Sequence, residues 1–288
     1  MAGGGLTVLA RQVASLPGTH GFSPIPQPRQ SVQIFWRRSR RLQSVLWPHT
    51  ALLEVGDRCT VRIDTVRSLA GVGAPLLNLV LALVLSRRGY QILHGGALAR
   101  LGDCIAILGP PGAGKSSLVL AGARLGMEVL SDELVPFRPI GTGFVCPGGN
   151  PAIRVDPALV PSGVAPAPAK KAPEDKVMID VRRLGWRAAD GPRRLAVLTL
   201  LGPRLGPRQP PCRIERLTPR EVLLGLLEST YMRRVLSPDQ RRRHLRLCAA
   251  AARVLPAYRL SVRQGIPNVS RAARALERLL LRHSASPA

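Results

Sequence analysis

The chain has 288 residues, of which 45% are hydrophobic and 3% aromatic, so it can bury a sizeable core built mainly of Leu, Val and Ala. Lysine and arginine total 42 against 17 acidic residues, and this net charge of +25 favours an anionic partner. No nucleic-acid recognition motif accompanies the charge, which argues against a nucleic-acid partner, and the 5 scattered cysteines argue against a zinc centre or a disulfide framework and for a cytoplasmic setting.

The first 93 residues are expected to form a small N-terminal part. Residues 1–30 are rich in Gly, Pro and Ser, which predicts disorder. Alternating and β-branched residues predict strands within 31–42 and 51–66. The longest apolar segment, Leu69–Leu85, is shorter than the about 20 residues that a membrane span needs. We therefore expect no transmembrane span but a buried helix from about Pro75 to Arg88, with the 31–93 segment packed on the core of the domain that follows.

Residues 91–109 predict a hairpin that turns at Leu101–Asp103 and leads into the octapeptide GPPGAGKS. This stretch fits the phosphate-binding pattern G-x-x-x-x-G-K-[ST], in which glycines let backbone N–H groups point at phosphate oxygens. Lys115 is expected to reach the terminal phosphates of ATP, and Ser116 to hold Mg²⁺. The predicted nucleotide-binding residues are Gly109, Pro110, Pro111, Gly112, Ala113, Gly114, Lys115, Ser116 and Ser117. The alternative is a Gly-Pro turn that matches the pattern by chance.

A helix at 115–126 and a strand at 127–133 are predicted next, which completes a strand–loop–helix–strand unit. The strand is expected to end in Asp132 and Glu133, at the edge where open α/β sheets bind ligands. One carboxylate would hold Mg²⁺ or accept a proton from a hydroxyl, and the alternative is a solvated turn. His94, followed by Gly95 and Gly96, is either a structural histidine or a ligand contact.

The rest of the chain predicts a loop, two strands and three helices. Residues 160–176 are Pro- and Ala-rich and predict a mobile loop, either a lid or a plain insertion. Strands are expected at 193–204 and 257–262, and helices at 218–236, 238–255 and 269–282, the first with a capping box of Thr218 and Glu221. The predicted fold is α/β, a mixed sheet with flanking helices, with one domain at 94–288.

The segment from His94 to Val135 resembles the HPr kinase/phosphorylase superfamily, a fold relative of phosphoenolpyruvate carboxykinase. Weaker resemblance continues through 214–236 and 256–262, toward HPr-kinase-related proteins that phosphorylate a serine of a precursor peptide. The resemblance implies that His94 is an active-site histidine, that Asp132 is the base for the incoming serine, and that Glu133 replaces a second aspartate with a metal role. It also implies a homo-oligomer, because the family commonly forms rings.

Two departures weaken the link to HPr itself. The family's further metal-binding signature downstream of the acid pair is missing, and residues 146–160 occupy its place, where Arg154 is a candidate phosphate contact. We also expect the family's regulatory N-terminal domain to be absent, because only about 90 residues precede His94. We therefore expect a Mg²⁺-dependent ATP kinase that acts on a serine of a peptide or small protein, and two alternatives stay open. These are a small-metabolite kinase, and a non-catalytic nucleotide-dependent scaffold or nucleic-acid-binding regulator.

Overall fold

The structure is a computed structural model, in which the chain forms two compact units. Unit 1 comprises Met1–Tyr90 and Met232–Asp239, and unit 2 comprises Gln91–Tyr231 and Gln240–Ala288. The described residues are 7–17, 23–25, 34–38, 42–47, 51–56, 60–65, 69–148, 151–155, 177–231, 233, 236 and 238–284. The predicted loop at 160–176 lies outside these ranges.

Unit 1 is a 6-stranded sheet and one helix with a core of their own. The sheet has the order β1-β6-β5-β4-β3-β2, in which only β1 and β6 pair in parallel. Apolar residues such as Leu53 and Val61 on the strands and Leu83 on the helix form this core. The elements are β1 (Thr7–Gln12), β2 (Ser23–Ile25), β3 (Ile34–Arg38), β4 (Leu42–Trp47), β5 (Ala51–Gly56), β6 (Thr60–Thr65) and α1 (Leu69–Arg87).

In unit 1 the structure differs from the sequence prediction at the first strands, at the unpredicted strand β4 and at the start of the helix. Residues 1–30, expected to be disordered, contribute β1 and β2, because β1 finds a parallel partner along the whole of β6. Helix α1 begins at Leu69 rather than near Pro75, since the apolar residues before the proline continue the helical run. Within the described residues, no helix combines the length and apolar character needed to cross a membrane.

Unit 2 is built on a 7-stranded mixed sheet with the order β10-β9-β7-β8-β13-β15-β14. Strands β8, β13 and β15 run parallel, whereas β7 is antiparallel to both of its neighbours, β8 and β9. The strands are β7 (Gln91–Arg100), β8 (Asp103–Leu108), β9 (Glu128–Ile140), β10 (Gly143–Cys146), β13 (Arg193–Leu201), β14 (Cys212–Arg216) and β15 (Ala257–Val262). The predicted mixed α/β architecture is confirmed in this unit.

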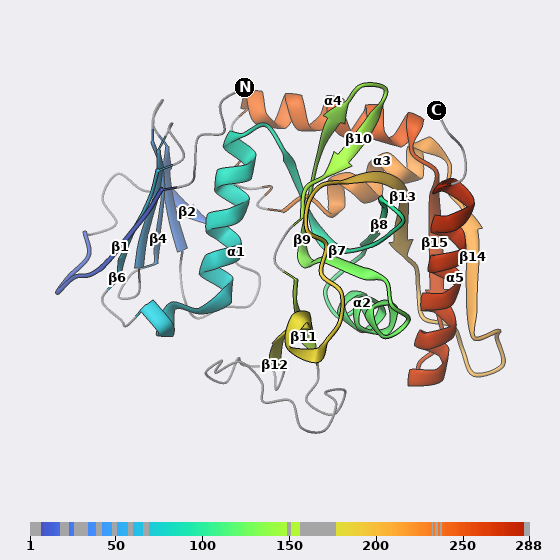
Figure 1. Ribbon diagram of the computed structural model, residues 1–288. Helices are drawn as coiled ribbons and strands as arrows, with labels where there is room; N and C mark the ends of the chain where they lie inside the picture. Colours follow the sequence, from blue (N-terminus) through green and yellow to red (C-terminus); the bar gives the residue numbers. More distant parts are fainter. Residues whose placement is uncertain are drawn as a thin grey trace. The chain divides into compact units, whose positions relative to one another are not determined.

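Helices cover both faces of this sheet (Figure 1). One face packs Ile105, Ile107 and Val119 with α5, and the other packs Leu108 and Val135 with α3 and α4. In the view of Figure 1, α4 runs along the upper side of the unit and α2 lies below it. The helices are α2 (Lys115–Arg124), α3 (Pro219–Glu228), α4 (Pro238–Val254) and α5 (Ile266–Ser284), and a small hairpin adds β11 (Ala152–Val155), β12 (Val177–Asp180) and the 3₁₀ turn η2 (Val181–Leu184).

Two predicted boundaries in unit 2 are wrong in ways that shape the site. Strand β9 runs on to Ile140 instead of ending at Glu133, because the buried residues Leu134, Val135 and Phe137 extend its pairing with β7. Helix α3 ends at Glu228 rather than continuing to 236, because the next residues form a β-bridge between Leu93 and Thr230. The predicted capping box of Thr218 and Glu221 is confirmed at the start of α3.

Candidate active site

The glycine-rich loop joins the end of β8 to the start of α2. Gly112 and Gly114 have φ values of 78° and 101°, which residues with a side chain rarely adopt, so glycine is required at both positions. Gly114 is the residue before the helix, and the first backbone N–H groups of α2 are directed back along the loop. The Lys115 side chain folds over the loop, where its Nζ donates to the carbonyls of Gly109 at 2.8 Å and Pro110 at 3.0 Å.

Asp132 lies beside this loop although it is in the middle of β9. It pairs with Gly96 of β7, and a Cβ placed on Gly96 would stand 3.6 Å from Asp132 Oδ1 and 2.4 Å from Val119 Cγ2. The absence of a side chain at Gly96 therefore lets α2 and the carboxylate approach the same point of the sheet. Two glycines after His94 permit a close approach, and at Gly96 the groups that approach belong to the protein itself.

The Asp132 carboxylate is buried, with 7% of its surface exposed. Burial raises its pKa above 3.8, the Arg154 N–H, the nearby Ser116 hydroxyl and the charge of Lys115 oppose the increase, the charge of Glu133 adds to it, and the net pKa is about 7. The Arg154 N–H donates to Oδ2 at 2.9 Å, whereas Oδ1 has no hydrogen-bond partner of normal geometry among the described residues. One oxygen is thus fixed, and the other is available for a proton or a metal ion.

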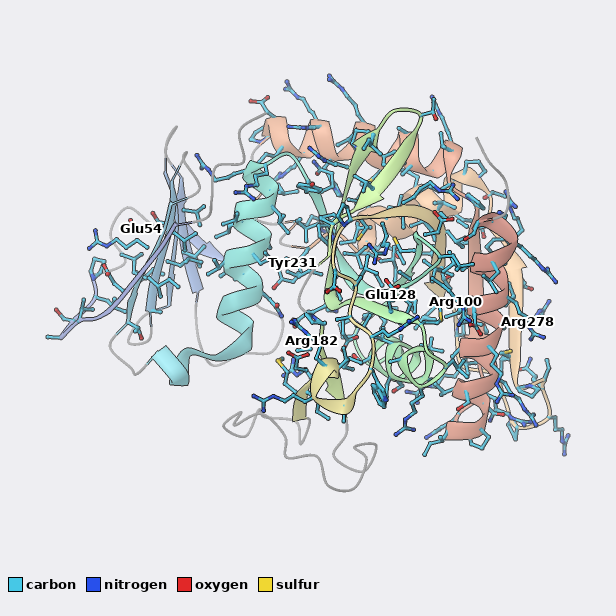
Figure 2. All side chains as sticks on the ribbon, viewed as in Figure 1. Glu54, Arg100, Glu128, Arg182, Tyr231 and Arg278 are labelled. Atoms are coloured by element: carbon cyan, nitrogen blue, oxygen red, sulfur yellow. The ribbon has the colours of Figure 1, made fainter. Side chains whose placement is uncertain are left out.

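His94 lies on β7, the strand next to β9, which carries Asp132. Its ring stacks on Tyr231 with ring centroids 6.3 Å apart. Tyr231, labelled in Figure 2, is held there because its N–H donates to the Ile92 carbonyl at 2.9 Å. Burial and then the charge of Lys115 lower the pKa of His94, a hydrogen bond with the Glu133 backbone opposes part of the decrease, and the net pKa is about 4. The ring is therefore neutral at physiological pH.

We expect the His94 ring to titrate with a midpoint near pH 4 in the folded protein, because burial and Lys115 both disfavour its protonated form. The measurement is the pH dependence of the histidine ring ¹H–¹³C signals, with the His94→Asn variant used to assign the resonance. A midpoint near the ordinary 6.5 would show that the ring is exposed to water and remote from Lys115.

A buried hydrogen-bond network supports the segment that carries Tyr231. His244 of α4 lies 2.6 Å from the Thr230 hydroxyl through Nε2 and 2.8 Å from the Gln91 side-chain oxygen through Nδ1. Thr230 also donates to the Leu226 carbonyl at 3.2 Å, which ties the segment to the last turn of α3. The network thus anchors the residue next to Tyr231 from two helices and from β7.

The other predicted site residues are placed less simply. Glu133 follows Asp132 directly within a continuous strand, where successive side chains leave opposite faces, so the two acids do not share one position. Asp132 is the acid that lies beside Ser116. The role of Glu133 as a magnesium ligand stays a prediction. The backbone N–H of Arg154 donates to Asp132, and a phosphate contact of Arg154 stays a prediction.

Sequence reasoning missed Tyr231 and Arg204. Tyr231 fell within a predicted helix, and nothing in its neighbourhood indicated a β-bridge to the His94 strand. Arg204 follows β13, and its Nη2 donates to the Gly112 carbonyl of the glycine-rich loop at 3.2 Å. Because β13 runs parallel to β8 and next to it, the residues that follow the two strands meet at one edge of the sheet. That pattern was available from the predicted strands.

The donors around the loop suit a magnesium–nucleotide complex. No cluster of three or more His, Cys, Asp or Glu able to hold a metal occurs within the described ranges. Mg²⁺ is usually held by one or two hard oxygen ligands of the protein together with substrate phosphates and water. The Ser116 hydroxyl and the buried Asp132 carboxylate with its unpartnered Oδ1 are donors of this kind.

Comparison with known proteins gave no sequence family. No family model matches the chain, and no curated protein sequence matches it. Among solved structures, the HPr(Ser) kinase/phosphatase from Coxiella burnetii is similar over 67% of this chain and 99% of that chain, with 15% identity and a TM-score of 0.35. The likeness is too weak to transfer residue roles, which therefore rest on the contacts of this chain.

Proposed function

We propose that unit 2 is an ATP- and Mg²⁺-dependent phosphotransferase that moves the γ-phosphoryl group to a serine hydroxyl of a peptide or small protein. The observation that carries this proposal is the Asp132 carboxylate. It is buried beside Ser116 and Lys115 of a phosphate-binding pattern, has a pKa of about 7, and has one oxygen without a partner among the described residues. A nucleotide-binding protein that only switches or holds its ligand would need no such base at this position.

Asp132 is the residue that takes the proton. Its Oδ1 accepts the proton of the serine hydroxyl while the serine oxygen forms a bond to the γ-phosphorus. The bond from that phosphorus to the bridging oxygen of ADP breaks in the same transfer, and ADP leaves with the electron pair. A carboxylate with a pKa of about 7 is a stronger base than an ordinary aspartate and is still ionised in a large fraction of molecules at neutral pH.

Lys115 and Arg204 supply positive charge at the loop. Lys115 donates to neutral carbonyls of Gly109 and Pro110, and phosphate oxygens are stronger, charged acceptors for the same ammonium group. Bound Mg²⁺ would neutralise further charge on the phosphates, with the Ser116 hydroxyl as its expected protein ligand. Arg204 holds the loop through Gly112 and places a guanidinium next to the phosphate position.

The acceptor class rests on the sequence resemblance. The segment 94–135 resembles the HPr kinase/phosphorylase superfamily, and the segments 214–236 and 256–262 resemble related kinases that phosphorylate a serine of a precursor peptide. A serine hydroxyl is one of the groups that a buried aspartate base can activate. The net charge of +25 further favours an acceptor with acidic residues near its serine.

The test is mass spectrometry of serine-containing peptides after incubation with ATP, Mg²⁺ and the full-length protein. We expect a phosphate on the serine of an acidic peptide, no product from the matched peptide with alanine in its place, and none with the Lys115→Met variant. Phosphorylation of small alcohols such as glycerol but of no peptide would contradict the peptide acceptor. ADP formation that persists in Lys115→Met would contradict the site.

A further inference from the structure

A cavity of about 310 Å³ opens on the side of α2 that faces away from Asp132. Its walls come from α2, from the loop after β13 and from the junction between β15 and α5, all within unit 2. The apolar part of the lining includes Leu120, Leu260 and Val269, and Arg124, Arg204 and Arg263 contribute positive charge. The residues Ala113, Gly114 and Ser117 belong both to this lining and to the glycine-rich loop with its helix start.

Helix α2 separates the cavity from the carboxylate. One side of the helix lines the cavity with residues that recur at helical spacing, which are Ser117, Leu120, Ala121 and Arg124. Val119 and Gly122, on the other side of the helix, pack on Gly96 and Leu98 of β7. The start of α2 is therefore the point at which the two sides meet, and a triphosphate held there would have Asp132 on one side and the cavity on the other.

We propose that this cavity binds the nucleoside of the nucleotide whose phosphates lie on the glycine-rich loop, an inference that rests on the proposed function. Ala113 and Gly114 of the loop are part of the cavity lining. A nucleoside in the cavity can therefore be joined to phosphates that lie on the loop. Its apolar walls suit the flat faces of a base, and the Gln264 and Ser270 side chains at its lining are of the type that bonds to base edges and ribose hydroxyls.

The size and charge of the cavity favour a nucleoside over other occupants. A volume of about 310 Å³ is at the lower end of the range for small-molecule sites and suits one base with its sugar, not a peptide segment. The guanidinium groups at the lining are partly held by the protein, since Arg204 bonds to Gly112, and Arg263 donates to the carbonyls of Pro207 and Gln209 at 2.8 Å and 3.1 Å. A base can stack on guanidinium groups held in this way.

The test compares two magnesium-bound probes, ATP and inorganic tripolyphosphate, by isothermal titration calorimetry. In Ser270→Trp a large side chain fills the cavity from α5, while Arg278→Trp places the same residue on the exposed side of that helix (Figure 2). We expect Ser270→Trp to weaken ATP binding at least tenfold and to leave tripolyphosphate binding unchanged. Arg278→Trp should bind both probes like the wild type.

The outcomes separate this inference from the proposed function. Unchanged ATP binding in Ser270→Trp would overturn the nucleoside cavity and leave the phosphate site standing. Equal loss of both probes in Ser270→Trp, with unchanged thermal stability, would also overturn it, because the cavity would then hold phosphate and no nucleoside. Binding of both probes that survives in Lys115→Met would instead overturn the proposed function itself. A milder variant, Ser270→Leu, gives the same comparison if the tryptophan prevents folding.

Discussion

Replacing Asp132 with asparagine is expected to lower the rate of phosphoryl transfer by about 10²–10⁴-fold, the usual contribution of a positioned general base. Asparagine is close to aspartate in size and can still accept the Arg154 N–H, so the geometry of β9 and β11 should persist. ATP binding should change little, because the loop and Lys115 are untouched. The measurement is kcat and KM for the acceptor peptide, with ATP affinity determined separately.

The same variant should be more stable than the wild type at alkaline pH. The folded-state pKa of Asp132 is raised above 3.8, so its contribution to stability is fully present below about 3.8 and is lost as the pH rises through about 7. Above pH 7 the wild type holds a buried carboxylate, and a pKa difference of about 3 corresponds to ~4 kcal/mol, an order-of-magnitude figure. Asparagine avoids this charge.

Urea unfolding of both proteins at pH 8 and at pH 5 measures the effect. The stability gain of Asp132→Asn should be larger at pH 8 and shrink at pH 5, where most folded wild-type molecules carry the proton. The exposed Asp190→Asn serves as the matched control and should change neither stability nor activity. A variant that loses stability at pH 8 would show that Asp132 is a structural carboxylate with strong partners, not a buried base.

Replacing Gly96 with alanine is expected to destabilise the protein by about 1–3 kcal/mol through overpacking. The new Cβ would stand 2.4 Å from Val119 Cγ2, and valine has little freedom to rotate away. Because α2 carries Lys115 and Ser116, its displacement should also lower kcat/KM by on the order of tenfold or more. Chemical unfolding and steady-state kinetics of the same preparation measure the two effects.

A second substitution tests whether the cause is this contact. In Gly96→Ala combined with Val119→Ala, the clashing methyl groups are gone, so the double variant should be more stable than the sum of the two single changes predicts. Gly143→Ala, in the same sheet, is the control, because a Cβ there meets nothing within 4 Å. Additive effects of Gly96→Ala and Val119→Ala would mean that the helix does not depend on close approach to β7.

The sequence was informative wherever local patterns decide the structure. Turn residues predicted the hairpin turn at Leu101–Asp103, and the structure has it at Leu101 and Gly102. Thr218 with Glu221 marked the start of α3. The glycine-rich loop and the helix after it follow from residues adjacent in the chain, because backbone conformation there is set by Gly112 and Gly114. The strand at 257–262 was also predicted with the bounds that the structure has.

The parts that failed depend on partners far away in the chain. Two adjacent acids suggested a strand end, but pairing with β7 carries β9 past Asp132 and Glu133 to Ile140. The role of Gly96 depends on Val119, and the role of Tyr231 on a bridge to Leu93, and neither contact has a local signature. The raised pKa of Asp132 likewise comes from burial, and its neighbours Ser116 and the Arg154 backbone come from parts of the chain that are distant in sequence.

The two sides of α2 have a consequence for how such a protein can evolve. One side of this helix lines the cavity, with residues such as Leu120 and Arg124. The other side packs toward the carboxylate, with residues such as Val119. Under the proposed assignment, a substitution on the first side alters which nucleotide donates the phosphate, and one on the second side alters the transfer step. Donor preference and acceptor chemistry can then be mutated and selected separately, although a single ten-residue helix carries both.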